Sequence, residues 1–262
     1  MVFDVHNLSY QSFSNINLQL DSGSFYAIIG CNGSGKTTLF KLFSSIILTD
    51  NMISCNGVLL NTQSRIEYLK KIGIVKSLHQ ESFLCQTVKD EMEKPLVNLG
   101  YSRKMIEERV LDVLIYFDKI DLLDERIDKL SISDKVLLLI MTSLLHEPKI
   151  LFLDGVLNIL NRREKKEIIG LLNQLCLRKD LCIINFTANI DETMFCDKIF
   201  LLNNYQLMDV KTFDDLVWND KTLLDNNLEV PFLYDLANKL KMYDLVKKEI
   251  DNMEELVDEI WH

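Results

Sequence analysis

The sequence lacks a long apolar run, an excess of basic residues and paired cysteines, and each absence excludes a class of protein. Its longest apolar stretch, residues 136–145, is broken only by Thr142 and Ser143 and is about half of the ~20 residues that a membrane span needs. A net charge of −10 with no basic stripe argues against a nucleic-acid partner. The six cysteines include no C-x-x-C pair, as is typical of scattered thiols in a reducing compartment. Because Asp4 and His6 interrupt any apolar core of a signal peptide, we expect a soluble, cytosolic chain with no transmembrane segment of its own.

Proline and glycine are also scarce, with three and nine residues among 262, and the sequence contains no repeat or low-complexity tract. A chain of this length can bury one large core, or form a main domain with a smaller lobe. Three of the nine glycines lie at positions 30, 33 and 35, between an apolar run and a helical pattern. This segment is the most informative part of the chain.

The glycine-containing segment fits the phosphate-binding motif G-x-x-x-x-G-K-[ST] with nothing missing. It consists of Gly30, Cys31, Asn32, Gly33, Ser34, Gly35, Lys36, Thr37 and Thr38. The apolar run 25–29 ahead of it predicts a buried strand, and residues 37–43 behind it predict a helix. Glycine lets the loop backbone approach phosphate oxygens, and the helix N-terminus adds partial positive charge. We expect Lys36 to contact the β- and γ-phosphates of a nucleoside triphosphate and the Thr37 hydroxyl to bind its Mg²⁺.

A second landmark is Asp154, which follows the apolar residues 150–153 at the end of a predicted buried strand. A strand-end aspartate alone is a weak sign, because many such residues cap helices. Downstream of a phosphate loop, however, a carboxylate at the carboxyl end of a parallel strand is in the usual place for a magnesium ligand. Thr37 and Asp154 are therefore the predicted metal ligands.

Apolar runs and helical periodicity alternate through the rest of the chain. Short apolar runs predict further strands, at residues 58–60, 72–75, 181–186 and 198–202. Residues 1–5 and 16–20 predict an antiparallel pair joined by a polar turn at 11–15. Residues 87–145 and the acidic tail from 214 predict helices. Because strands that alternate with helices form a parallel sheet with crossover connections, the predicted fold class is α/β.

With these motifs, the chain resembles the ATP-binding subunits of ABC transporters, most closely those of energy-coupling-factor (ECF) importers. The segments that carry the resemblance are residues 72–75, 87–91, 98–102, 130–134 (in place of the signature L-S-G-G-Q), 147–154 and 228–231. The resemblance implies a P-loop NTPase of the ABC ATPase type, with a parallel core sheet, an antiparallel β subdomain, an inserted helical subdomain and a C-terminal helical tail. The implied division is an ATP-binding domain at 1–213, including a helical subdomain at about 78–147, and a helical extension at 214–262.

The resemblance also implies ATP and Mg²⁺ as cofactors and a peripheral place at the cytoplasmic face of the cell membrane. There the chain would couple ATP binding and weak hydrolysis to import of a small solute, with an integral membrane subunit docked against residues 78–100. Such ATPases dimerise head to tail, so the signature of each chain faces the ATP held by the other. The signature residues that would face a second ATPase subunit are Ser131, Ile132 and Ser133.

The chain departs from this family at the positions that carry hydrolysis. Gly155 replaces the glutamate that polarises the attacking water, Ala188 replaces the switch histidine and Ser77 replaces the Q-loop glutamine. Ile132 and Ser133 replace the two signature glycines. Loss of a positioned general base typically costs about 10²–10⁴-fold in rate. The sequence therefore assigns no catalytic residue, and predicts a chain that keeps the residues for binding and works in a heterodimer with an intact ATPase.

Two alternative functions stay open, and so does the contact with adenine. The chain could be a soluble P-loop regulator that senses nucleotide and meets no membrane, although the full length of residues 78–100 favours a transporter subunit. It could instead be an active ATPase in which Gln80 or Asn189 fills a missing role through a shifted loop. Family members stack an early aromatic residue on adenine, and Tyr10 is the nearest candidate, followed by Phe13, although either ring could simply pack in a strand.

Overall fold

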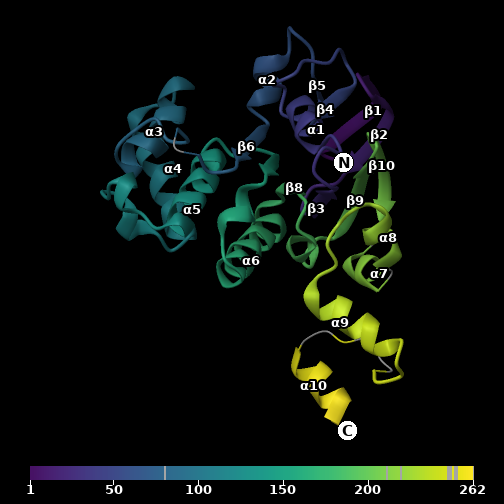
Figure 1. Cartoon of the computed structure of the whole chain (residues 1–262). Coiled ribbons are helices and arrows are strands. Elements are labelled where there is room, and N and C mark those ends of the chain that lie inside the picture. The colour runs from purple at the N-terminus through teal and green to yellow at the C-terminus, as the bar shows by residue number, and fades with distance from the viewer. Residues whose placement is uncertain (80, 211, 219, 247–249, 251–252, 262) are drawn as a thin grey trace.

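The computed structural model describes the chain except residues 80, 211, 219, 247–249, 251–252 and 262. Within this described part, a six-stranded sheet crosses the centre of the molecule in the order β10-β9-β3-β8-β7-β6 (Figure 1). Its strands are β3 (Phe25–Ile29), β6 (Ile72–Lys76), β7 (Ile150–Asp154), β8 (Cys182–Thr187), β9 (Lys198–Asn203) and β10 (Gln206–Val210). Neighbouring strands run parallel except β10, which pairs antiparallel with β9. Every residue of β3 and β8 is buried, and all of them are apolar except Asn185 and Thr187 of β8.

A second, antiparallel sheet has the order β2-β1-β4-β5 in the described residues. Its strands are β1 (Phe3–Tyr10), β2 (Phe13–Leu20), β4 (Ile53–Cys55) and β5 (Val58–Leu59). The polar turn predicted at 11–15 is too long, because β2 already begins at Phe13, which pairs directly with Tyr10 at the end of β1. Only Gln11 and Ser12 connect the strands, and a left-handed φ of 50° at Gln11 closes this tight turn.

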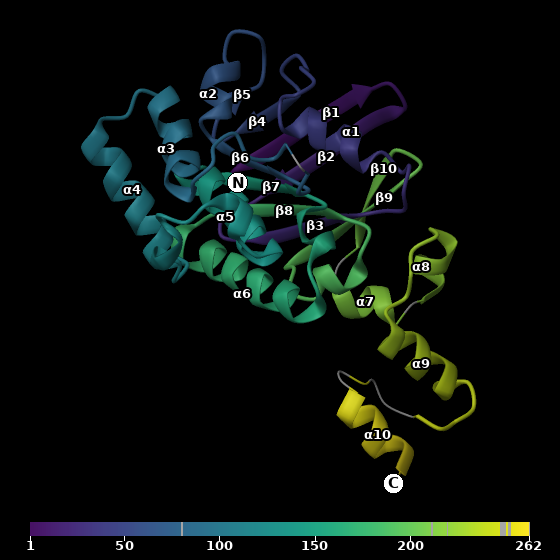
Figure 2. The ribbon, with the colours of Figure 1, turned by 60° about the vertical axis from the view of Figure 1, so that its left-hand side comes forward.

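Helix α1 (Lys36–Phe43) lies between the two sheets and fills the core that they share. The Phe43 ring makes edge contacts with Phe3 of β1 at 5.0 Å and with Phe186 of β8 at 6.1 Å between ring centroids. The short helix α2 (Arg65–Leu69) closes the end of α1, since the buried Tyr68 hydroxyl donates a hydrogen bond of 2.6 Å to the Phe43 carbonyl. Helix α6 (Arg162–Lys179) covers the opposite face of the central sheet, so the sheet is buried on both sides (Figure 2).

Three helices form a separate group beside the central sheet, where the sequence predicted helices from residue 87 to 145 (Figure 1). They are α3 (Val88–Asn98), α4 (Arg103–Tyr116) and α5 (Ile132–Leu144), and they contact one another. Short 3₁₀ helices connect the elements here and elsewhere, at η1 (Ile120–Leu122), η2 (Ile127–Lys129), η3 (Val156–Ile159) and η4 (Ile190–Thr193). The side chains of Thr87, Ser102 and Ser131 cap the three helices by accepting a backbone N–H bond.

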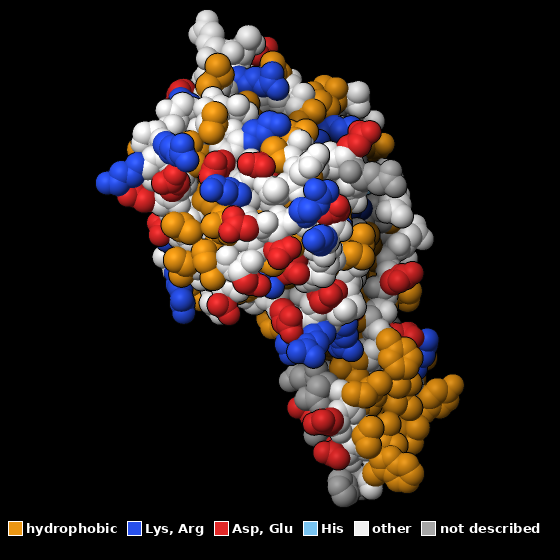
Figure 3. All heavy atoms as spheres, turned by 90° about the vertical axis from the view of Figure 1, so that its left-hand side faces the viewer, with side chains coloured by type: hydrophobic (Ala, Val, Ile, Leu, Met, Phe, Trp, Pro, Cys, Tyr) orange, Lys and Arg blue, Asp and Glu red, His pale blue; other side chains and the backbone are white. Residues whose placement is uncertain are grey.

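The C-terminal helices project from the body of the molecule (Figure 2). They are α7 (Phe213–Val217), α8 (Asp220–Asp225), α9 (Phe232–Lys241) and α10 (Met253–Trp261). Helices α7 and α9 pack on the central sheet. Phe213 and Leu216 of α7 and Tyr234 of α9 form one hydrophobic cluster with Ile29 and Ile199. Exposed hydrophobic side chains gather on the projection, and acidic side chains lie beside them (Figure 3). No helix in the described residues is long and apolar enough to cross a membrane.

Candidate nucleotide-binding site

The loop between β3 and α1 takes its shape from its glycines. Gly33 and Gly35 have φ of 85° and 107°, values that residues with a Cβ rarely adopt. Gly30 is required for a different reason, because a Cβ there would lie 2.5 Å from both the Leu202 carbonyl oxygen and the Ser34 hydroxyl oxygen. The Ser34 N–H donates to the Cys31 carbonyl at 3.1 Å, which closes the turn. The loop therefore wraps tightly around the N-terminus of α1.

Lys36, the first residue of α1, folds its side chain back over this loop. Its Nζ donates hydrogen bonds to the carbonyl oxygens of Gly30 at 2.6 Å and Cys31 at 2.9 Å. Burial lowers the pKa of the Lys36 ammonium, while the neighbouring side chains of Cys31 and Asp154 oppose that shift. The ammonium thus occupies the interior of the loop, where phosphate oxygens would compete with the two carbonyls.

Asp154 lies at the carboxyl end of β7, facing the loop. Burial raises the pKa of its carboxyl, and the charges of Lys36, Lys76 and Lys41 act in the opposite direction. Thr37 is exposed in the first turn of α1. No cluster of three or more His, Cys, Asp or Glu side chains that could hold a metal occurs among the described residues. Asp154 and the Thr37 hydroxyl line the same cavity, and such a pair suits Mg²⁺, which is usually held by one or two carboxylates together with phosphate oxygens and water.

Loop and carboxylate border one cavity of about 350 Å³. Its lining residues are Asn32, Gly33, Gly35, Lys36, Thr37, Thr38, Asp154, Gly155, Asn158, Phe186, Thr187, Ala188 and Tyr205. The fit to a triphosphate is supported by the Ser34 hydroxyl, which is buried without a hydrogen-bond partner in the described part of the chain. Tyr10 does not line this cavity, while Asn158, Phe186 and Tyr205 do, although the motifs gave no signal for them.

The side of the cavity beyond Asp154 is formed by small residues. Gly155 adopts a left-handed φ of 62°, and a Cβ there would lie 3.1 Å from Asn158 Nδ2 and 3.9 Å from Ser77 Cβ. Its N–H donates to the Phe186 carbonyl at 3.1 Å, so the backbone is fixed in this conformation. Ser77 is paired with His79, whose Nε2 lies 3.1 Å from the Ser77 hydroxyl oxygen.

The segment after β8 contains Ala188 and Asn189. The Asn189 side-chain oxygen accepts a hydrogen bond from the Asp191 N–H at 3.0 Å and so caps η4. The Asn189 N–H donates to the Thr187 hydroxyl at 3.0 Å, and its side chain is not among those that line the loop cavity. Gln80, the other candidate to replace a missing group, lies outside the described residues.

A buried polar group holds this segment against α6. Glu192 of η4 is fully buried and accepts from Lys165 Nζ and from Asn185 Nδ2, each at 3.0 Å. The carboxylate is therefore neutralised by one cation and hydrogen-bonded to one amide, as a buried charge requires. These two contacts of Glu192 fix the loop after β8 against α6, even though Ala188 itself has no polar side chain.

The signature segment lies at the start of α5, within the group of three helices and apart from the loop cavity of its own chain (Figure 1). Ser131 is the N-cap of α5, accepting from the Asp134 N–H at 3.0 Å and donating to Asp134 Oδ2 at 2.6 Å. The Ile132 side chain is 49% exposed. The structure therefore does not bring the residues 131–133 together with the residues 30–38.

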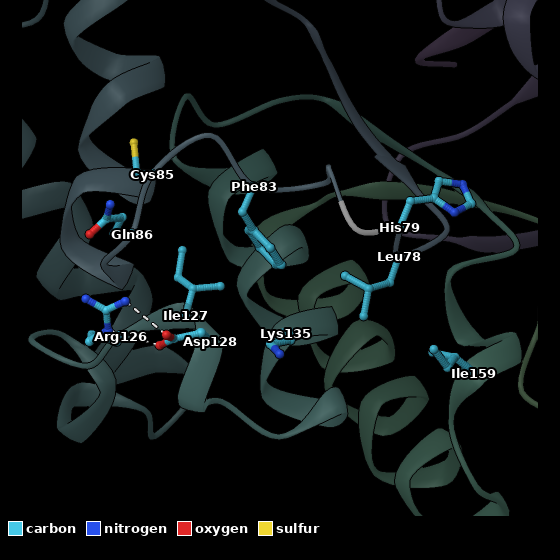
Figure 4. A pocket seen from close by; sticks show the side chains of 10 residues that line it. All are labelled: Leu78, His79, Phe83, Cys85, Gln86, Arg126, Ile127, Asp128, Lys135 and Ile159. Atoms are coloured by element: carbon cyan, nitrogen blue, oxygen red, sulfur yellow. Dashed lines mark hydrogen bonds and ion pairs between the residues drawn. The ribbon is translucent and has the colours of Figure 1, made fainter.

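A second cavity, of about 680 Å³, lies between α5, η2 and the chain that follows β6. Its lining residues are Leu78, His79, Phe83, Cys85, Gln86, Arg126, Ile127, Asp128, Lys135 and Ile159. Leu78 and Phe83 project into it, and the ion pair of Arg126 with Asp128, at 2.9 Å, lies at its edge (Figure 4). This cavity is thus an apolar depression with a charged rim.

Comparison with known families and proteins agrees with this geometry. The family model described as ABC transporter matches residues 13–158. The energy-coupling factor transporter ATP-binding protein EcfA1 of Mesomycoplasma hyopneumoniae (strain 7448) is 29% identical over 258 residues, which cover 98% of this chain and 93% of that protein. The EcfA1 of Lactobacillus acidophilus is 31% identical, over 87% of this chain and 82% of that protein.

A solved structure agrees as well. That of cbiO1 from Clostridium perfringens, described as part of the ABC transporter complex cbiONQ, has a TM-score of 0.78 and 24% identity. The similarity covers 90% of this chain and 98% of cbiO1, and shows that the two share a fold. Because the family model covers more than half of the sequence, the chain belongs to the ABC transporter family.

Proposed function

We propose that the chain is the ATP-binding subunit of an ECF-like ABC importer, placed at the cytoplasmic face of the membrane, where ATP binding and weak hydrolysis are coupled to import of a small solute. The observation that carries this proposal is the single cavity bordered by the loop, Lys36 and Asp154. In this proposal residues 1–213 form the ATP-binding domain and residues 214–262 a helical extension.

In the proposed site the backbone of the residues 30–38 and Lys36 hold the triphosphate. Thr37 and Asp154 would hold Mg²⁺, which would supply positive charge to the phosphates. Lys36 Nζ would exchange the carbonyl oxygens of Gly30 and Cys31 for phosphate oxygens. That exchange relieves the loss of solvation that lowers the pKa of the ammonium, because each phosphate oxygen is a stronger acceptor than a carbonyl.

The proposed partner in ATP use is a second, intact ATPase subunit. Gly155 and Ala188 present no general base or acid to the cavity, so this chain serves chiefly as an ATP-dependent clamp. In a head-to-tail heterodimer, Ser131, Ile132 and Ser133 would face the ATP of the partner. The branched Ile132 side chain, 49% exposed, would then stand where close backbone approach to a phosphate needs glycine.

The proposed membrane partner docks at the cavity that Phe83 and Leu78 enter (Figure 4). An apolar depression beside a charged rim suits an amphipathic helix from a membrane subunit. Replacing Phe83 with Asn should release the chain from membranes without changing ATP affinity. Leu177→Asn is the control, because Leu177 of α6 is 82% exposed, lies outside residues 78–100 and does not line the cavity. A chain that stays entirely out of the membrane fraction in native lysate would support the regulator alternative.

Calorimetry with Mg-ATP tests the binding proposal directly. Lys36→Ala should abolish measurable binding, because it removes the only cation inside the described loop residues. Lys70→Ala is the control, since the Lys70 ammonium makes a surface ion pair with Glu67 at 2.8 Å, away from the loop. Full affinity in the Lys36→Ala variant would refute the proposal.

A further inference from the structure

An unusual tyrosine stands at the turn between β9 and β10. Asn204 and Tyr205 form this two-residue connection, with φ of 47° and 61°. Both residues are thus left-handed, as in the tight hairpin turns that favour Asn and Gly. Asparagine tolerates this conformation well, whereas a bulky side chain there is an outlier. Turn geometry alone therefore gives no reason for tyrosine at position 205.

The Tyr205 ring lies against the phosphate loop. A Cβ on Gly35 would be 2.9 Å from Cδ1 and 3.2 Å from Cε1 of Tyr205. Phe13 approaches the same glycine, with its Cζ at 2.8 Å from that position. The Phe13 and Tyr205 rings meet edge to face, with 5.3 Å between centroids and 88° between planes. Gly35 is thus covered by two aromatic rings that hold each other in a fixed orientation.

Only one of these rings is available to a ligand. Phe13 is 2% exposed, and so it supports Tyr205 from within the core. Tyr205 is partly exposed and lines the same cavity as Lys36 and Asp154. The other aromatic side chain among the described residues of that lining, Phe186, is 1% exposed. Tyr205 is therefore the aromatic surface that this cavity offers.

We propose that Tyr205 is the side chain on which the base of the bound nucleotide stacks, in the role that the sequence gave to Tyr10. This inference rests on the proposed function, because the loop must hold the triphosphate for the base to meet the ring. Base–aromatic stacking needs a flat, supported ring and little else, and Tyr205 braced by Phe13 supplies it. Tyr10 instead ends β1, paired with Phe13 across a connection of two residues, and lies outside the cavity lining.

Calorimetry with two ligands, Mg-ATP and Mg-tripolyphosphate, separates stacking from phosphate binding. Tyr205→Gly removes the ring and suits the left-handed turn, so the fold should be retained. The Kd for Mg-ATP should rise roughly 5- to 150-fold, the effect expected from losing one stacked base. The Kd for Mg-tripolyphosphate, which has no base, should stay unchanged. Tyr10→Ala is the matched control and should leave both values unaltered.

Fluorescence gives a second measurement that does not depend on loss of binding. In Tyr205→Trp, added ATP should quench the emission of the new indole, whereas tripolyphosphate should not. The unaltered chain, with Trp218 and Trp261, supplies the baseline.

Three outcomes would overturn the inference. The first is the same ATP affinity in the unaltered chain and in Tyr205→Gly, and the second is an equal loss of affinity for ATP and tripolyphosphate in Tyr205→Gly. The third is a loss of ATP affinity that occurs only in Tyr10→Ala. If the unaltered chain bound neither ligand, the proposed function itself would fail.

Discussion

The two sides of the loop cavity differ in what they are made of. On one side, glycine backbone, Lys36 and Asp154 provide the groups that bind phosphate and Mg²⁺. On the other side, Gly155 and Ala188 provide neither charge nor a hydrogen-bonding side chain. Binding depends on a backbone shape that a few glycines enforce, whereas hydrolysis depends on individual side chains. The second set can therefore be lost without disturbing the fold.

The two sides do not differ in how firmly their backbone is held, because hydrogen bonds also fix the side that contains Gly155 and Ala188. Gly155 N–H is bonded to the Phe186 carbonyl at 3.1 Å, and Glu192 is held by Lys165 and Asn185 at 3.0 Å each. The segments after β7 and β8 are thus fixed by backbone bonds and a buried ion pair. A loss of catalysis in this chain would follow from missing chemical groups rather than from loose loops.

The comparison of the two sides of the cavity predicts its largest effect on the rate of ATP hydrolysis. The purified chain alone should hydrolyse ATP at least about 10²-fold more slowly than ordinary enzymes, because no positioned base faces the cavity. Phosphate release under saturating Mg-ATP measures this rate, and Lys36→Ala reports any contaminating ATPase. Turnover of ~1–10³ s⁻¹ by the unaltered chain would show that other residues carry the chemistry.

Next in size is the contribution of the buried ion pair to stability. Lys165→Met leaves the fully buried Glu192 carboxylate without its cation and should cost about 3–5 kcal/mol in the free energy of unfolding. Urea unfolding, followed by circular dichroism, gives the value. Lys166→Met on the exposed face of α6 is the control and should change stability little. Equal effects of the two substitutions would mean that the pair does not anchor the segment.

A rescue experiment tests whether hydrolysis can be restored by placing acid–base side chains at positions 155 and 188. Gly155→Glu with Ala188→His should restore little turnover, because glutamate at 155 must adopt a left-handed φ and its Cβ would lie only 3.1 Å from Asn158 Nδ2. Adding Asn158→Ser removes that contact, and we expect roughly a tenfold further gain in the rate of phosphate release. If the first two substitutions alone gave full activity, the backbone after β7 would not be adapted to glycine.

The negative charge of Asp154, on the side of the cavity that binds phosphate, lowers the stability of the folded chain. Since burial raises the pKa of its carboxyl, the ionised form is disfavoured in the folded chain. Asp154→Asn should therefore raise the melting temperature at pH 7 without nucleotide, and this gain should vanish below about pH 4, the unfolded pKa. The same variant should weaken Mg-dependent ATP binding roughly tenfold. A lower melting temperature at pH 7 would contradict this account of the carboxylate.

Sequence reasoning found what local patterns encode. The apolar run 25–29, the loop and the helix behind it correspond to β3 and α1, and the family resemblance is confirmed by the match over residues 13–158. The polar turn predicted at 11–15 was too long at its end, because Phe13 pairs with Tyr10 across the hairpin and so belongs to β2. The contact of Tyr205 with Gly35 could not be predicted, since residues 170 positions apart (205 − 35) meet only through the order of strands in the sheet.

The smallest predicted effect concerns the signature serine, which lies outside both sides of this cavity. The Ser131 hydroxyl caps α5 by accepting from the Asp134 N–H at 3.0 Å, so Ser131→Ala should lower the free energy of unfolding by about 1 kcal/mol. Ser133→Ala, inside the same helix, should be neutral or slightly stabilising because alanine is the better helix former. Urea midpoints measure both, and calorimetry should show unchanged Mg-ATP affinity in each isolated variant. Weaker ATP binding by the isolated Ser131→Ala chain would mean that the signature also acts on the site of its own chain, and the separation of the two segments seen here would not hold.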